Sequence, residues 1–95
     1  MSVTATGNVS GGNFGIRAGN LGAGATTIFA NTVSSSGLDG IFAYNGASGT
    51  NITIAATGAV TGAIDGIDAT NNGSGMLAIT SAAVTGSAGN GILVS

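Results

Sequence analysis

The chain contains no cysteine, histidine or proline, and it has one basic and three acidic residues among 95. Without cysteine or histidine, it lacks the residues for disulfides, zinc sites, haem or iron–sulfur ligation, and Cys–His or Ser–His catalysis. A single cation, Arg17, cannot neutralise a row of phosphates, which excludes nucleic-acid binding and attachment to an anionic membrane. No apolar run approaches the roughly 20 residues of a transmembrane helix. We therefore expect no cofactor and no membrane insertion.

Glycine is abundant, with 19 residues, but the chain fits neither of the usual glycine-rich classes. Collagen needs glycine at every third position together with much proline. Disordered chains combine low hydrophobicity with high net charge, whereas this chain has a mean hydropathy of +0.53 and a net charge of −2. Such a sequence must fold or aggregate. It also begins in mid-pattern and without a signal peptide, and we expect it to be a segment of a longer protein.

A Gly-Ile dipeptide recurs at intervals of 25, 26 and 25 residues and defines an internal repeat. A valine followed by serine or threonine precedes each isoleucine by seven or eight residues, and another apolar position lies five or six residues before that valine. The repeat divides the single domain 1–95 into coils at about 1–25, 26–50, 51–75 and 76–95. The isoleucines of the dipeptide form the clearest column: Ile16, Ile41, Ile67 and Ile92.

Within each repeat the apolar columns lie two residues apart, which is the period of a β-strand. No segment has the spacing of three and four residues that a helix requires. Three short strands in about 25 residues are too few for a propeller blade, but they suit one coil of a triangular solenoid. The sequence thus predicts an all-β, right-handed parallel β-helix of just under four coils, with the hand taken from the general rule for parallel crossovers.

Two columns of corner residues accompany the strands. Asparagines lie four residues after the column isoleucine, at Asn20, Asn45 and Asn71. Glycines lie eight residues after it, at Gly24, Gly49 and Gly75. We expect both columns to be structural: the glycines at positive-φ positions, and the asparagines in left-handed corners with their amides bonded in a ladder along the axis.

The acidic residues Asp39 and Asp65 occupy equivalent positions before two of the Gly-Ile dipeptides, in one column with Phe14 and Asn90. Stacked coils place their backbones about 4.8 Å apart, a spacing that invites comparison with the paired acids of glycosidases. The chain lacks long side loops that would form a cleft, so we expect no enzyme. The favoured interpretation is a corner in which these side chains accept backbone N–H bonds, and a weak cation site between the two carboxylates is the minor alternative.

Outward positions offer other binding surfaces. Arg17, Phe42 and Asp68 share one outward column, and we expect Arg17 to contact Phe42 rather than the more distant Asp68. Aromatic residues that could stack on carbohydrate are scattered over several columns, at Phe14, Phe29, Phe42 and Tyr44. Outward threonines suggest an ice-binding face, but the Thr-x-Thr pattern is interrupted in every coil.

The segments NITIAATGAVTGAIDGIDATNNGSG and MLAITSAAVTGSAGNGILVS, together with the two preceding repeats, resemble the passenger repeats of bacterial autotransporters and related large surface adhesins. The resemblance covers essentially the whole chain. It implies a β-helix stalk displayed extracellularly, at the bacterial outer-membrane surface, as a scaffold for adhesion to host or matrix glycans. No catalytic residue of that family maps onto this sequence.

Neither end of the repeat carries a proline, a charged edge or an amphipathic helix that would cap a solenoid. The first and last coils therefore complement each other in column and period. We expect copies to stack head to tail into filaments, so that the main partner of the chain is itself. A binding surface for carbohydrate, a cation or ice on one face is the alternative function.

Overall fold

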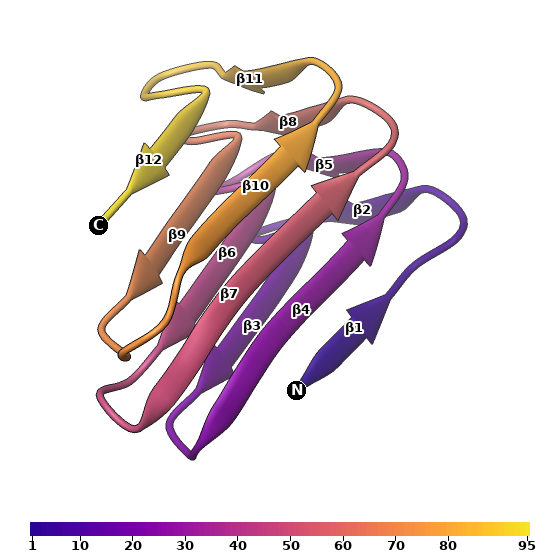
Figure 1. Ribbon diagram of the computed structural model, residues 1–95. Helices are drawn as coiled ribbons and strands as arrows, with labels where there is room; N and C mark the ends of the chain where they lie inside the picture. The colour runs from indigo at the N-terminus through magenta and orange to yellow at the C-terminus, as the bar shows by residue number, and fades with distance from the viewer.

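The computed structural model describes all 95 residues as a parallel β-solenoid of about four coils (Figure 1). Each coil contributes one strand to each of three four-stranded sheets, which give the solenoid a triangular cross-section. Sheet A contains β1 (Ser2–Thr4), β4 (Gly24–Ala30), β7 (Gly49–Ala56) and β10 (Leu77–Ser81). Sheet B contains β2 (Val9–Gly11), β5 (Val33–Ser35), β8 (Val60–Gly62) and β11 (Val84–Gly86). Sheet C contains β3 (Ile16–Asn20), β6 (Ile41–Asn45), β9 (Ile67–Asn71) and β12 (Ile92–Val94).

Every strand pairs in parallel with its equivalent in the next coil, and like residues face like residues. In sheet C the register joins the isoleucines of the Gly-Ile dipeptides in one file: Ile16, Ile41, Ile67 and Ile92. In sheet B the file consists of valines: Val9, Val33, Val60 and Val84. This register confirms the predicted parallel β-solenoid, and the two chain termini lie at opposite ends of the stack (Figure 1).

The core is a narrow column of aliphatic side chains along the solenoid axis. Alternation within the strands produces it, since β6 buries Ile41 and Ala43 while Phe42 and Tyr44 point outward. Thirteen buried apolar residues form one cluster, and all of them are isoleucine, valine or alanine. The core isoleucines and valines of the two middle coils are completely excluded from solvent, and each contributes about 1.5–3 kcal/mol by burial.

The corner between sheets C and A uses asparagine differently from our expectation. No asparagine has a positive φ, so the prediction of left-handed corners is wrong for Asn20, Asn45 and Asn71. Their amides do not form an axial ladder with one another. Asn45 instead donates to the carbonyl oxygen of Asn51 at 3.1 Å and accepts from the Thr26 hydroxyl at 2.6 Å. Each side chain satisfies backbone carbonyls of the turn that follows it, which ties the end of one strand to the start of the next.

The glycines of that corner are also only partly as predicted. Gly24 has a φ of +95°, but Gly49 and Gly75 do not lie in the positive-φ region. Close approach explains the latter two instead. A Cβ at Gly49 would lie 2.9 Å from Cγ of Asn45, and one at Gly75 would lie 2.1 Å from Oδ1 of Asn51. The column is therefore kept free of side chains by the packed asparagines beside it.

The glycine of the Gly-Ile dipeptide is required by the contact between coils. A Cβ at Gly15, Gly40 or Gly66 would lie 2.6 Å from the carbonyl oxygen of the equivalent glycine in the next coil. It would also approach the valine of sheet B in that next coil, at 2.4 to 2.8 Å from its Cγ1. The dipeptide thus combines two demands of stacking: a bare backbone at the corner and a large aliphatic side chain inside.

Candidate functional site

The two end coils present the solenoid interior to solvent. Column residues that are fully buried in the middle coils, such as Ile28 and Ile67, have counterparts at the ends that remain partly exposed. At the C-terminal end Ile92 and Val94 are 44% and 52% exposed. At the N-terminal end, Val3 is half-buried.

The backbone N–H and C=O groups along the outer edges of the two end coils are also free to pair with further strands. The outermost strands are β1, β2 and β3 at one end and β10, β11 and β12 at the other, and each pairs on one side only. Edge strands of this kind pair readily with further strands. The two ends carry the same columns in the same order, so that a second copy placed on the stack would bring Ile79 over Val3 and Ile92 over Ile16.

The two candidate acids lie in one column, as their spacing requires, and both are buried. Oδ1 of Asp39 accepts a hydrogen bond from the backbone N–H of Asp65 at 3.1 Å. Oδ1 of Asp65 in turn accepts from the N–H of Asn90 at 2.6 Å. Each carboxylate therefore binds the backbone of the next coil, so that the column links three successive coils. No group of three or more acidic, histidine or cysteine side chains is arranged to hold a metal ion.

A third acid, Asp68, lies half-buried on the outward face of sheet C. Its burial raises the pKa of the Asp68 carboxyl above the ordinary value of 3.8. The neighbouring charges of Asp39 and Asp65 raise this pKa further. The structure thus concentrates all the acidic side chains of the chain within electrostatic reach of one another.

On the same face, Arg17 is held by aromatic rings and not by an acid. Its guanidinium carbon lies 5.7 Å from the ring centroid of Phe42, as the sequence predicted, and also 5.7 Å from that of Phe14. The two rings contact each other, with centroids 5.5 Å apart. Asp68 lies on β9, with β6 between it and the strand of Arg17, at a separation of roughly 9–10 Å.

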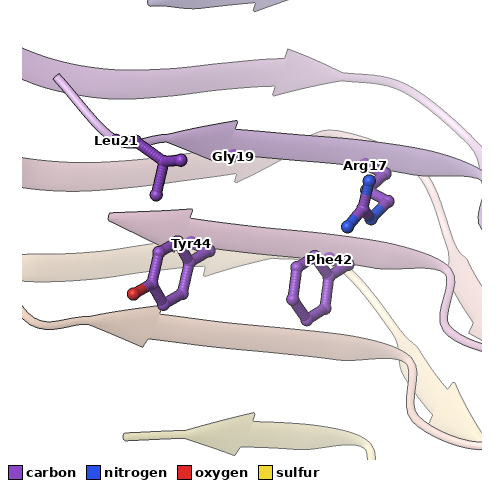
Figure 2. Close-up of a pocket in the computed structure, with 5 residues that line it drawn as sticks. All are labelled: Arg17, Gly19, Leu21, Phe42 and Tyr44. Atoms are coloured by element: carbon purple, nitrogen blue, oxygen red, sulfur yellow. The ribbon is translucent and has the colours of Figure 1, made fainter. Parts of the chain in front are cut away.

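Beside this cluster lies an open groove of about 410 Å³, lined by Arg17, Gly19, Leu21, Phe42 and Tyr44. Figure 2 shows Arg17 and Gly19 on β3 with Leu21 just beyond its end, and Phe42 and Tyr44 along the neighbouring strand. Gly19 faces Tyr44 in the register of sheet C and leaves the middle of the groove empty. Sequence analysis missed this glycine, because its place opposite an aromatic residue appears only once the register is known.

Of the four aromatic residues, Phe14, Phe42 and Tyr44 lie near one another, whereas Phe29 lies on the outward side of sheet A. The outward threonines of sheet A do not form a continuous array. The register aligns Ser2, Thr27, Thr53 and Ala78 in one row, and the next row contains Thr4, Phe29, Ala55 and Thr80.

No protein-family model, curated protein or solved structure matches the chain. The fold and its register define the class of protein, a parallel β-solenoid of about four coils. None of its secondary-structure elements is a helix that could cross a lipid bilayer.

Proposed function

We propose that the chain is a structural stalk segment of a surface-displayed adhesin, without catalytic activity, whose coils extend by end-to-end stacking. The observation that carries this proposal is the open, self-complementary pair of end coils. Several apolar columns that the middle coils bury completely are left partly exposed by the end coils, most of all at Ile92 in the last coil, whereas Ile16 in the first coil is already buried. Stacking a copy on either end would bury those side chains and pair the free strand edges.

The composition supports the same function. The net charge of −2 is small, so that little repulsion opposes association of identical ends. A head-to-tail contact of this kind does not close into a ring, and it generates a filament. The likeness of the repeats to autotransporter passengers supports placing such a stalk outside the cell. The absence of a catalytic role is supported by Asp39 and Asp65, whose Oδ1 atoms are engaged by the backbone.

Concentration-dependent assembly tests the proposal. Sedimentation velocity over a wide concentration range is expected to show a rising sedimentation coefficient, and electron microscopy is expected to show fibres at high concentration. Fibre diffraction should give an axial repeat of about 4.8 Å. A chain that remains strictly monomeric at millimolar concentration would contradict end-to-end stacking.

A pair of end-blocking variants separates ordered stacking from unspecific aggregation. Val3→Lys places a charge on the N-terminal end, and Val94→Lys places one on the C-terminal end. Both side chains are partly exposed, so a lysine can extend into solvent without unfolding the coil. Each variant retains one functional end and should be monomeric alone. A mixture in equal amounts should form a dimer with a mass of twice 8.8 kDa and nothing larger.

The matched control is Ile64→Lys, which removes an apolar side chain that is 40% exposed but lies outside the end coils. This variant should assemble like the parent chain. If unspecific contact between apolar surfaces drove association, the control would lose as much assembly as the end variants, and mixing Val3→Lys with Val94→Lys would restore nothing.

A further inference from the structure

Gly19 is a glycine that the fold does not require. It lies inside β3, where glycine weakens a strand relative to alanine by roughly 0.5–1 kcal/mol. Its φ is not positive, and a Cβ built on it would meet no atom within 4 Å. A glycine in a strand often marks a place where a ligand or another backbone approaches closely. The empty middle of the groove is consistent with that explanation.

Arg17 supplies an unused recognition group at one end of the groove. Two aromatic rings position its guanidinium, and it donates no hydrogen bond to any other residue of the chain. A guanidinium presents five N–H donors in a fixed fork that matches a carboxylate with two parallel bonds. Because the rings hold the side chain in place, less rotamer entropy is lost when the fork binds an anion.

At the other end, Tyr44 and Leu21 complete the lining. The hydroxyl oxygen of Tyr44 accepts a bond from the side-chain amide of Asn72 at 3.4 Å, which leaves the O–H proton for a ligand. Leu21 is 80% exposed. From Arg17 to Leu21 an extended chain spans roughly 13 Å, and the volume of about 410 Å³ falls within the usual range of small-molecule sites, ~300–1,000 Å³.

We propose that this groove binds a carboxylated sugar unit of an acidic polysaccharide, with the carboxylate on Arg17 and the sugar ring over Gly19 beside Tyr44. The apolar C–H face of a pyranose suits the glycine floor and the aromatic wall, and its hydroxyls reach the open rim. A peptide strand is a poorer fit, because the groove lies over β3 and β6, whose facing edges already pair with each other, and the free edge of β3 lies on its other side, at the end of the solenoid. Asp68 lies roughly 9–10 Å from Arg17, about one Debye length at 0.1 M salt, so screening reduces its repulsion of the bound carboxylate without removing it.

Saturation-transfer NMR on the full chain tests the proposal, with each variant compared at the same state of assembly. The probes are trigalacturonate and its fully methyl-esterified form, which keeps the sugar rings but loses the charge. Trigalacturonate is expected to give signal and the ester at least tenfold less. Arg17→Lys should weaken binding of the acid about tenfold by removing the fork, and Arg17→Gln should make the acid and the ester equal.

Gly19→Thr is the decisive variant, because it fills the groove with a good strand former and should leave the coil intact. Binding should fall at least tenfold, with a far-ultraviolet spectrum like that of the parent. The matched control is Thr70→Val, in the same outward row but one strand beyond Tyr44, and it should bind normally. Equal binding of acid and ester, or unchanged binding after Gly19→Thr, would overturn the proposal. Neither result bears on end-to-end stacking.

Discussion

Replacing glycine by alanine should have opposite effects on stability at two positions of this solenoid. At Gly40 the added Cβ would lie 2.6 Å from the carbonyl oxygen of Gly66, 2.8 Å from Cγ1 of Val60 and 3.0 Å from the carbonyl oxygen of Thr61. Ordinary contacts between such atoms are about 3.5–4.0 Å. The second and third coils must therefore separate by roughly 1 Å at this corner.

The cost at Gly40 has two parts. Overpacking of this kind costs about 1–3 kcal/mol. The displaced carbonyl of Gly66 also accepts the backbone N–H of Ile41 at 2.9 Å, and loss of that bond adds about 0.5–1.5 kcal/mol. Gly40→Ala should thus destabilise the chain by about 1.5–4.5 kcal/mol, a large fraction of the ~5–15 kcal/mol typical of a folded domain. The melting temperature should fall by about 10–30 °C.

Gly19→Ala is the matched comparison. Its Cβ meets nothing within 4 Å and its φ is not positive, so the variant gains from a less flexible unfolded chain, by about 0.4–1 kcal/mol. Calorimetry and urea unfolding at low concentration, before filaments form, measure both variants. If the two substitutions shift stability in the same direction, close approach between coils is not what requires glycine at the Gly-Ile corner.

Three further predictions concern single side chains. Ile41→Ala empties a fully buried site and should cost about 2–5 kcal/mol in urea unfolding. Asn45→Ala removes the bonds to Thr26 and Asn51 and should cost about 1–3 kcal/mol by the same assay, whereas an exposed surface change should cost almost nothing. The raised pKa of Asp68 means that its neutral form is favoured in the folded chain. Protonated Asp68 therefore contributes to the stability of the fold, fully below pH 3.8, and this contribution is lost as the pH rises through the folded pKa. Asp68→Asn should therefore be more stable than the parent at pH 7 by less than about 1 kcal/mol, and the difference should vanish below pH 3.8 in paired urea titrations.

The fold could be predicted because residues that stack on one another in successive coils recur at a regular interval in the sequence. Each coil meets the same environment above and below, so the interior residue recurs, and the file from Ile16 to Ile92 could be read from spacing alone. The contact of Arg17 with Phe42 followed from the same alignment. The period of the repeat and the register of the coils were enough to predict both the file and the contact.

The corners could not be predicted in the same way. A recurring asparagine or glycine indicates a constrained position but not the constraint. Asn45 serves by reaching carbonyls five and six residues ahead, with ordinary backbone angles. Gly49 and Gly75 serve by leaving room for side chains, and only Gly24 uses a left-handed angle. These distinctions depend on directions of bonds at the turn, which the spacing of residues does not contain.

Positions at which the residue type changes from coil to coil indicate which residues serve binding, whereas positions at which it recurs serve stability. Inside sheet C one residue type fills the file from end to end, whereas the outward row beside it holds Arg17, Phe42, Asp68 and Leu93 in successive coils. Stacking makes the same demand on every coil, so it does not explain four different residues in one row.

A variant with Arg17, Phe42 and Tyr44 all changed to threonine tests that separation. The interior file is untouched, and the one change in an end coil, at Arg17, lies on the outward face of β3, so parallel register and end-to-end assembly should persist, with fibres in electron micrographs like those of the parent. Binding of trigalacturonate should disappear. Loss of the fibres in this variant, with the monomer still folded, would show that the outward face of sheet C takes part in assembly and that the two roles share one surface.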